Sequence, residues 1–334
     1  MTTKNRDQQN RVVKTFDATG RELHVDVPLS GLVVNYRTQG LLGEVIFPVI
    51  EVDKQHNFIP TIPLGEFLKA ESAIRAPGTE ARKVRYNVGT IPYFCKNYAL
   101  KFPFTVEDRE NADAVWNLRE NGAIMITDLL NIGKEIRVTN AVNSGSNVNT
   151  AYLPKSAWNA ATNANNPLTD LETVVNRVED TTGFRPNLIV FGQTAWRTFK
   201  THSAVRAILF PHGGGYAVPG QAAALLEVDR VVVARGYYNS AAEGFTASLS
   251  PFYSDAVWAF YNPPGGQIGP LPRFSATFRW RLAGVPSMTV EVHPYDTKTK
   301  SEEIEVGVYD DEKVIDNRLG VCILGVNSAQ SGGI

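Results

Sequence analysis

Two extended segments that contain proline, residues 45–63 and 82–104, most strongly constrain how this chain can fold. The prolines are Pro48, Pro60, Pro63, Pro92 and Pro103. Proline has no backbone N–H to donate, so helices and central strands exclude it, and both segments are predicted to be extended. Two strands of about 12 residues would reach about 40 Å, and an isolated pair of strands is marginal in water. We therefore expect a two-armed projection that lies against another surface.

The far part of this projection is basic. Residues 73–88 read AIRAPGTEARKVRYNV, and the basic residues are Arg75, Arg82, Lys83 and Arg85. Val84, Tyr86 and Val88 alternate with polar residues, which predicts a half-buried strand with one apolar and one cationic face.

The carboxy-terminal part of the chain is acidic and could supply a partner for this basic segment. Residues 65–101 contain seven basic and three acidic residues, whereas residues 287–316 contain nine acidic and three basic residues. This complementarity suits a head-to-tail contact between copies, with Glu302, Glu303 and Glu305 as the expected acidic partners. The alternatives are a solvated surface or a nucleic-acid contact, and the formal net charge of −1 disfavours a dedicated nucleic-acid binder.

A long helix is predicted after the second extended segment. Thr105 and Asp108 have the spacing of a capping box, and apolar or small residues then recur every three or four positions. These stripe residues are Val115, Leu118, Gly122, Ile126, Leu129, Gly133 and Ile136. A helix from about residue 107 to about residue 140 would be about 50 Å long. Glycine is costly within a helix, so we expect another element to approach closely at Gly122 and Gly133.

Residues 186–286 are predicted to form an α/β unit around one sheet. The stretches PNLIVFG, VDRVVVAR and AVWAFYNPP are typical of buried strands, and QTAWRTFKTHSAVRAIL of a helix. A helix before this unit should begin at a capping box formed by Thr169 and Glu172 and end at Gly183. After Phe274 the chain is mostly strand, so the fold class is α+β.

No motif in the chain makes a convincing active site. The run His212, Gly213, Gly214, Gly215 is similar to the oxyanion loop of esterases, but the chain has no Gly-x-Ser-x-Gly nucleophile motif. An exposed surface loop is the simpler interpretation. The five histidines lie far apart and have no zinc-site spacing, so we expect no metal and no cofactor. Cys95 and Cys322 have no pairing motif, and we expect both to be reduced.

The order of these parts resembles the major capsid proteins of tailed double-stranded DNA phages, which have the Hong Kong 97-like fold. The resemblance rests on the stretches VIFPVIEVDK, RAPGTEARKVRY, YALKFPFTVEDRENAD, PNLIVFGQTAWRTFKTHSAV, LLEVDRVVVARGYYNSA and SEEIEVGVYDDEKVIDNRLG. It implies an N-terminal arm (1–44), an extended loop (45–104), a peripheral domain with a spine helix (105–185), an axial domain (186–286) and closing strands of the peripheral domain (287–334). It also implies that residues 212–215 lie at the centre of a capsomer.

The resemblance further implies a structural protein without catalytic activity. Its copies would form the hexamers and pentamers of an icosahedral head enclosing double-stranded DNA, with only non-specific contacts to that DNA. A separate scaffolding protein, a portal and a decoration protein would be its partners. The polar amino terminus and the lack of a long apolar run predict assembly in the host cytoplasm and no membrane contact. Two alternatives remain: a shell protein of a cellular nanocompartment or gene-transfer particle, and an α/β hydrolase that uses His212.

Overall fold

The computed structural model describes most of the chain. The described residues are 13–16, 22–25, 29–30, 32–33, 40–69, 74–75, 77–81, 83–85, 87–111, 117–148, 151–152, 157–159, 166–242, 244–263, 271–281 and 287–327.

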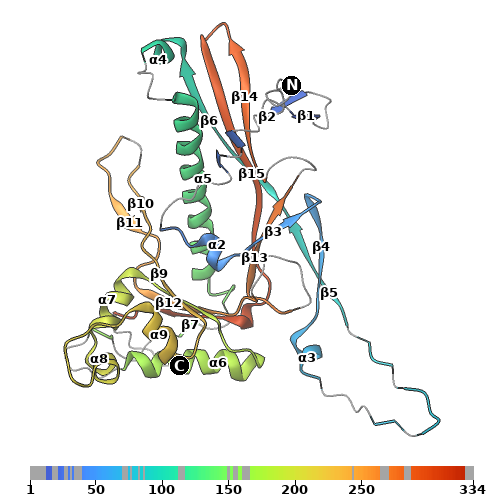
Figure 1. The fold of residues 1–334 in the computed structure, drawn as a ribbon, viewed down its shortest axis with the longest axis vertical. Coiled ribbons are helices and arrows are strands. Elements are labelled where there is room, and N and C mark those ends of the chain that lie inside the picture. Colours follow the sequence, from blue (N-terminus) through green and yellow to red (C-terminus); the bar gives the residue numbers. More distant parts are fainter. Residues whose placement is uncertain are drawn as a thin grey trace, which may run out of the picture.

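A long sheet with a helix along one face forms the upper part of the molecule (Figure 1). Its central strand is β15 (Ser301–Val314), which pairs antiparallel with β14 (Met288–Asp296), β6 (Lys96–Thr105) and β13 (Ser275–Trp280). The sheet is completed by β3 (Val49–Val52), beside β13, and by the hairpin of β1 (Val13–Phe16) and β2 (Glu22–Val25), beside β14. Helix α5 (Leu118–Asn143) packs on β6 and β15 through a core that includes Phe104, Ile126 and Ile304.

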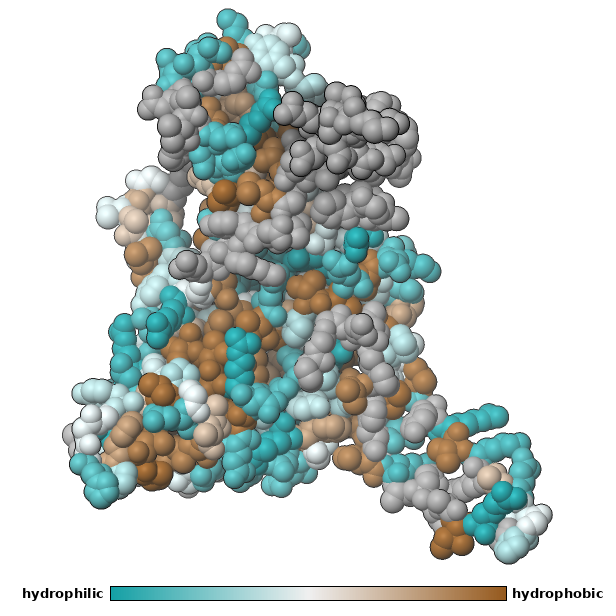
Figure 2. Space-filling view, viewed as in Figure 1, coloured by the Kyte–Doolittle hydropathy of each residue, from teal (hydrophilic) through white to brown (hydrophobic). Residues whose placement is uncertain are grey.

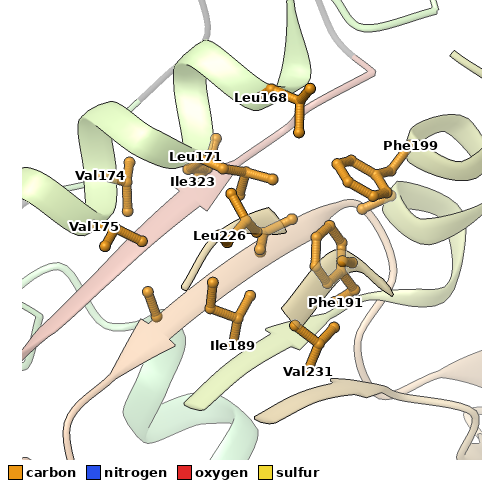
Figure 3. Packing of buried hydrophobic residues seen from close by; sticks show 14 of the residues in the cluster. Leu168, Leu171, Val174, Val175, Ile189, Phe191, Phe199, Leu226, Val231 and Ile323 are labelled. Atoms are coloured by element: carbon orange, nitrogen blue, oxygen red, sulfur yellow. The ribbon is translucent and has the colours of Figure 1, made fainter. Parts of the chain in front are cut away.

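A second sheet of five strands forms the lower part. Its order is β7 (Ala151–Tyr152), β16 (Gly320–Leu324), β12 (Ala256–Phe260), β8 (Leu188–Phe191) and β9 (Arg230–Val233). One face packs against α6 (Pro167–Thr182), α7 (Gln193–Thr201), α8 (Ser203–Leu209) and α9 (Pro219–Leu225), as Figure 3 shows for Leu171, Phe191 and Phe199. The other face, which includes Val190 and Trp258, packs against α2 (Gly43–Ile46) and the end of α5. The short helix η1 (Asn317–Leu319) joins the two sheets.

The lower unit does not follow the predicted division of the chain at residues 185/186 and 286/287. Helix α6 and strand β16 were expected in the peripheral domain, but both contribute to the core of the five-stranded sheet through residues such as Leu171 and Ile323. Strand β13, expected in the axial domain, pairs in the long sheet instead. Sequence order did not reveal this because β16 lies far along the chain from β12, with which it pairs.

Several predicted boundaries differ from the structure. The long helix is divided into α4 (Val106–Asn111) and α5, with Asn117 capping α5, while residues 112–116, including Val115, lie outside the described residues. The Thr105–Asp108 capping box is confirmed at α4. Helix α6 starts at Pro167 with Asn166 as its cap, so the predicted Thr169–Glu172 start is wrong, whereas Gly183 ends the helix as predicted. The single helix predicted over residues 193–209 is two helices, because His202 caps α8.

A network of buried charges holds α2, α5 and the long sheet together. Asp310 on β15 is fully buried and accepts two hydrogen bonds from Arg279 on β13, at 2.7 and 2.8 Å. Lys134 on α5 lies 3.6 Å from Asp310 and 3.5 Å from Glu44 on α2.

Glu135, the next residue on α5, accepts hydrogen bonds from the backbone N–H groups of Leu42 and Gly43, at 2.9 and 2.6 Å. Buried charges are found where partners compensate for lost hydration, so this network ties three separate segments to one geometry.

The two glycines of α5 are expected to respond in opposite ways to alanine. A Cβ on Gly122 would lie 2.8 Å from the Phe102 ring, whereas one on Gly133 would meet nothing nearer than 3.7 Å. Close approach is therefore confirmed at Gly122 and not at Gly133. Gly133→Ala should gain up to about 1 kcal/mol from helix propensity. Gly122→Ala should be less stable than Gly133→Ala by at least about 1 kcal/mol, because the half-buried Phe102 ring must shift. Urea unfolding of dispersed subunits would measure both, and equal stabilities would contradict the packing at Gly122.

Candidate contact surfaces

The extended loop has an anchored base and an exposed far part. Strands β4 (His56–Thr61) and β5 (Gly89–Phe94) pair antiparallel, and the described residues between them, which include α3 (Leu64–Phe67), extend away from both sheets (Figure 1). At the base, Tyr93 packs against Phe278 with ring centroids 5.2 Å apart, and its hydroxyl donates a hydrogen bond to the Lys54 carbonyl. Burial raises the pKa of the Cys95 thiol to about 12, with Asp311 adding to the effect, so this base holds a neutral thiol. The base is thus part of the folded core.

The far part of the loop exposes large apolar side chains. Leu68, Ile74, Val84 and Val88 are 59, 95, 53 and 58% exposed. Figure 2 shows hydrophobic atoms of this loop among hydrophilic ones at the lower right. Exposed apolar residues gathered on one segment typically mark a contact surface. The segment is therefore a candidate surface for binding another protein chain.

The strand predicted from residue 82 onward begins only at Gly89. The described residues 83–85 and 87–88 form no strand, and Val84 and Val88 are exposed rather than half-buried. A strand needs a neighbour for its backbone hydrogen bonds, and this chain supplies none there among the described residues. Arg82 and Tyr86 lie outside the described residues. Arg75 donates a hydrogen bond to the Thr79 carbonyl. Lys83 forms an ion pair with Glu80 at 3.1 Å, and Arg85 is exposed.

The three acidic residues predicted as partners do not share one surface. Side chains alternate along a strand, so Glu302 projects toward α5 and pairs with Arg119, whereas Glu303 and Glu305 lie on the opposite face. Lys101 on β6 lies 3.4 Å from Glu303 and 3.5 Å from Glu305. All three acids thus have a basic partner within their own chain, and the sequence count of charges could not show these pairs.

The loop that follows α8 has an exposed, glycine-rich backbone. Gly213 and Gly214 have φ values of 82 and 96°, which favour glycine, and a Cβ at either position would have nothing within 4 Å. His212 is also exposed, and Gly215 is half-buried beside the Phe210 side chain. Around the loop, Ile208, Tyr216 and Val218 are 55, 61 and 52% exposed. The run is an open surface loop, as expected, and its apolar surroundings make it a second candidate contact surface.

A third exposed surface was missed in the sequence. Strands β10 (Tyr237–Asn239) and β11 (Leu249–Pro251) form a hairpin that projects from the lower unit, on the opposite side from the extended loop (Figure 1). Phe245 and Leu249 are 78 and 71% exposed. A run rich in small and polar residues lies between two aromatic pairs in GYYNSAAEGFTASLSPFY, and it was a signal of this hairpin. The molecule thus carries exposed apolar side chains on two opposite edges.

Comparisons with known proteins identify similar chains. No protein-family model matches. The chain is 25% identical over 226 residues to the major capsid protein of Burkholderia phage BcepMu, covering 66% of this chain and 72% of that protein. A phage-related protein from Bordetella bronchiseptica RB50 is similar in structure, with a TM-score of 0.71, 20% identity and coverage of 91 and 97% of the two chains. The capsid of cyanophage P-SCSP1u is also similar, with a TM-score of 0.56, 11% identity and coverage of 88 and 90%. The predicted resemblance and the Hong Kong 97-like fold are thereby confirmed.

Proposed function

We propose that this chain is the major capsid protein of a tailed double-stranded DNA phage, a structural protein whose copies assemble into an icosahedral head around the genome. Support comes from the similarity to the BcepMu major capsid protein and from the phage-capsid fold. The observation that carries the proposal is the extended loop, whose base lies in the core while its far part exposes Leu68, Ile74 and Val84. Other copies of the chain would cover these side chains in a shell.

In this proposal the exposed surfaces join copies within hexamers and pentamers. In a ring, one edge of each subunit contacts a different edge of the next. The extended loop and the β10–β11 hairpin lie on opposite edges, as such a contact requires (Figure 1). The loop around His212–Gly215 would lie at the capsomer centre. Residues 1–44 would form the N-terminal arm, and the axial domain would comprise residues 186–263 together with α6 and β16, because these share one core.

The basic residues of the loop would set the register of this contact. Apolar side chains such as Val84 would supply most of the affinity, because exposed ion pairs contribute only about 0–1 kcal/mol each. Of the three predicted acidic partners, Glu303 and Glu305 lie on one face. Lys101 of the same chain already pairs with both glutamates, so an arginine from a neighbouring copy would have to share these two carboxylates with Lys101.

The remaining partners follow from the same proposal. A separate scaffolding protein, a portal and a decoration protein would complete the head, and contacts with packaged DNA would be non-specific. Assembly would take place in the host cytoplasm and the protein would reside in the virion. Among the described helices, none combines the length and apolar character needed to cross a bilayer.

Electron microscopy of the purified recombinant protein tests the proposal. We expect closed shells of uniform size, and particles from a phage-producing host should contain DNA. Shells that never package DNA would favour the nanocompartment alternative, and protein that stays monomeric under all assembly conditions would contradict the proposal. An ester-hydrolysis assay with a His212→Ala control tests the hydrolase alternative, and we expect no turnover by either protein.

A further inference from the structure

Three side chains of metal-ligand type meet on the face of the long sheet that lies opposite α5. Glu291 and His293 are two residues apart on β14, so they project to the same side, and Glu305 on β15 is the direct cross-strand partner of Glu291. One carboxylate oxygen from each glutamate and one ring nitrogen of His293 all lie within 4.8 Å of one another. His293 Nε2 is 2.9 Å from a Glu305 oxygen. All three residues are half-buried.

The opposed glutamates are not explained by the packing of the sheet. Like charges directly opposite on neighbouring strands are destabilising. Lys101 contacts Glu305 and Glu303 from the β6 side. On the β14 side, no hydrogen bond or ion pair to the Glu291 carboxylate is found among the residues that the structure describes. The site thus holds two carboxylates and one imidazole nitrogen in close proximity.

We propose that Glu291, His293 and Glu305 bind a divalent transition-metal ion of the Zn²⁺ type. One imidazole nitrogen and two carboxylate oxygens suit such an ion, with water completing the coordination. Mg²⁺ and Ca²⁺ prefer oxygen ligands alone, so the imidazole selects against them. The ion would neutralise the opposed glutamates and link β14 to β15. This inference does not depend on shell formation, since all three ligands belong to one chain.

The sequence could have indicated this site. The expectation of no metal rested on the wide separation of the histidines along the chain. The Glu-x-His pair in TVEVHPYD places two ligands on one face of a strand, and the turn at residues 297–300 returns Glu305 beside them. Cross-strand register, not sequence spacing, brings the three together.

Isothermal titration calorimetry with Zn²⁺ on dispersed full-length subunits tests the proposal. We expect wild-type protein to bind one ion at this site, and Glu291→Gln or His293→Ala to weaken the binding at least about tenfold, since even residues that only support metal ligands have effects of about 10–100-fold. His212→Ala is the matched control, because His212 lies on an exposed loop of the other sheet unit, and it should bind as wild type does. Equal binding by wild type and His293→Ala would overturn the proposal, as would absence of binding by wild type.

Two further measurements distinguish a metal site from a cluster of side chains that only stabilises the sheet. Lys101→Met removes a competing cation from Glu305, so it should tighten Zn²⁺ binding, whereas a cluster that only stabilises the sheet would bind no better. Co²⁺ should give visible ligand-field absorption in wild-type protein and in Lys101→Met but not in His293→Ala. Circular dichroism identifies any variant that fails to fold, and in that case the conservative Glu291→Gln decides the outcome.

Discussion

Replacing Asp310 by alanine is expected to abolish the recovery of folded subunits. The carboxylate is fully buried, bound by Arg279 through two hydrogen bonds and 3.6 Å from Lys134. Without it, these two buried cations keep an ion pair only with the partly exposed Glu44 among the residues that the structure describes. Removing one partner of a buried ion pair costs about 3–5 kcal/mol, a large part of a stability of about 5–15 kcal/mol. Soluble yield and urea unfolding of any recovered protein would measure the loss.

An exposed pair of the same chemical type serves as the control for this prediction. Arg281 and Glu51 are 3.0 Å apart, with side chains 51 and 48% exposed. Glu51→Ala should cost less than about 1 kcal/mol, because water replaces the lost partner. Similar losses in Asp310→Ala and Glu51→Ala would show that the buried network does not hold the sheet to α2 and α5.

The same network predicts a loss of stability in acid. Burial by itself would raise the pKa of Asp310, but the hydrogen-bonded Arg279, with Lys134 and Arg137, holds that pKa below its usual value. Asp310 therefore contributes stability that is present above about pH 4 and lost as the pH falls through the lowered pKa. Unfolding curves of wild type measured between about pH 5 and pH 2 should show this decline.

Reversing two charges of the extended loop is expected to block shell growth while the subunit stays folded. The change is Arg82→Glu with Arg85→Glu, and Arg85 lies in the exposed far part of the loop, outside all four buried cores. Each contact is weak, but it would repeat at every subunit, so reversal turns many small attractions into repulsions. Sedimentation should find dispersed subunits in place of shells, with circular dichroism unchanged. High salt should slow assembly of wild type, because charges are screened over about 8–10 Å.

Two further variants show whether charge is the cause. Arg82→Lys with Arg85→Lys keeps the charge and should still form shells, whereas normal shells from the glutamate variant would remove the proposed contact. Rescue of that variant must reverse Glu303, Glu305 and Lys101 together, because Lys101 otherwise loses both of its partners. Failure of the rescue alone would redirect the search to other acidic residues of the neighbour.

The sequence predicted best the elements whose burial depends on local pattern. Strand β8 is one apolar run, LIVF, with all four residues buried, and it lies where the pattern indicated. The buried face of the long helix was harder to predict. Leu129 belonged to the predicted apolar stripe but is 48% exposed, while Lys134 and Glu135 are buried. Charged residues on a helix usually face solvent, so only the positions of Asp310 and of the Leu42 backbone reveal why these two do not.

For the candidate contact surfaces too, some features could be predicted from the sequence and others could not. The separation of Glu302 from Glu303 and Glu305 follows from the alternation of side chains and was available in the sequence. Their pairing with Arg119 and Lys101 was not, because it depends on how β6 and α5 register against β15. The described residues in the far part of the extended loop form no strand of their own, and a single sequence cannot show which structure a neighbouring copy would induce there.

The continuity of β15 has a mechanical consequence. This one strand pairs with β6 over ten residues, from Ser301 with Thr105 to Asp310 with Lys96, and β6 leads directly into the arm of the extended loop. At this same end, just beyond Asp310, β15 continues through η1 into β16 of the five-stranded sheet. A pull that separates the loop from the five-stranded sheet therefore acts on one end of the β6–β15 pair, and it would open the hydrogen bonds between the two strands one after another, starting beside Lys96 and Asp310. Tension between neighbouring subunits would thus act first on the end of the long sheet nearest the five-stranded sheet, and the ten paired residues would yield gradually from that end.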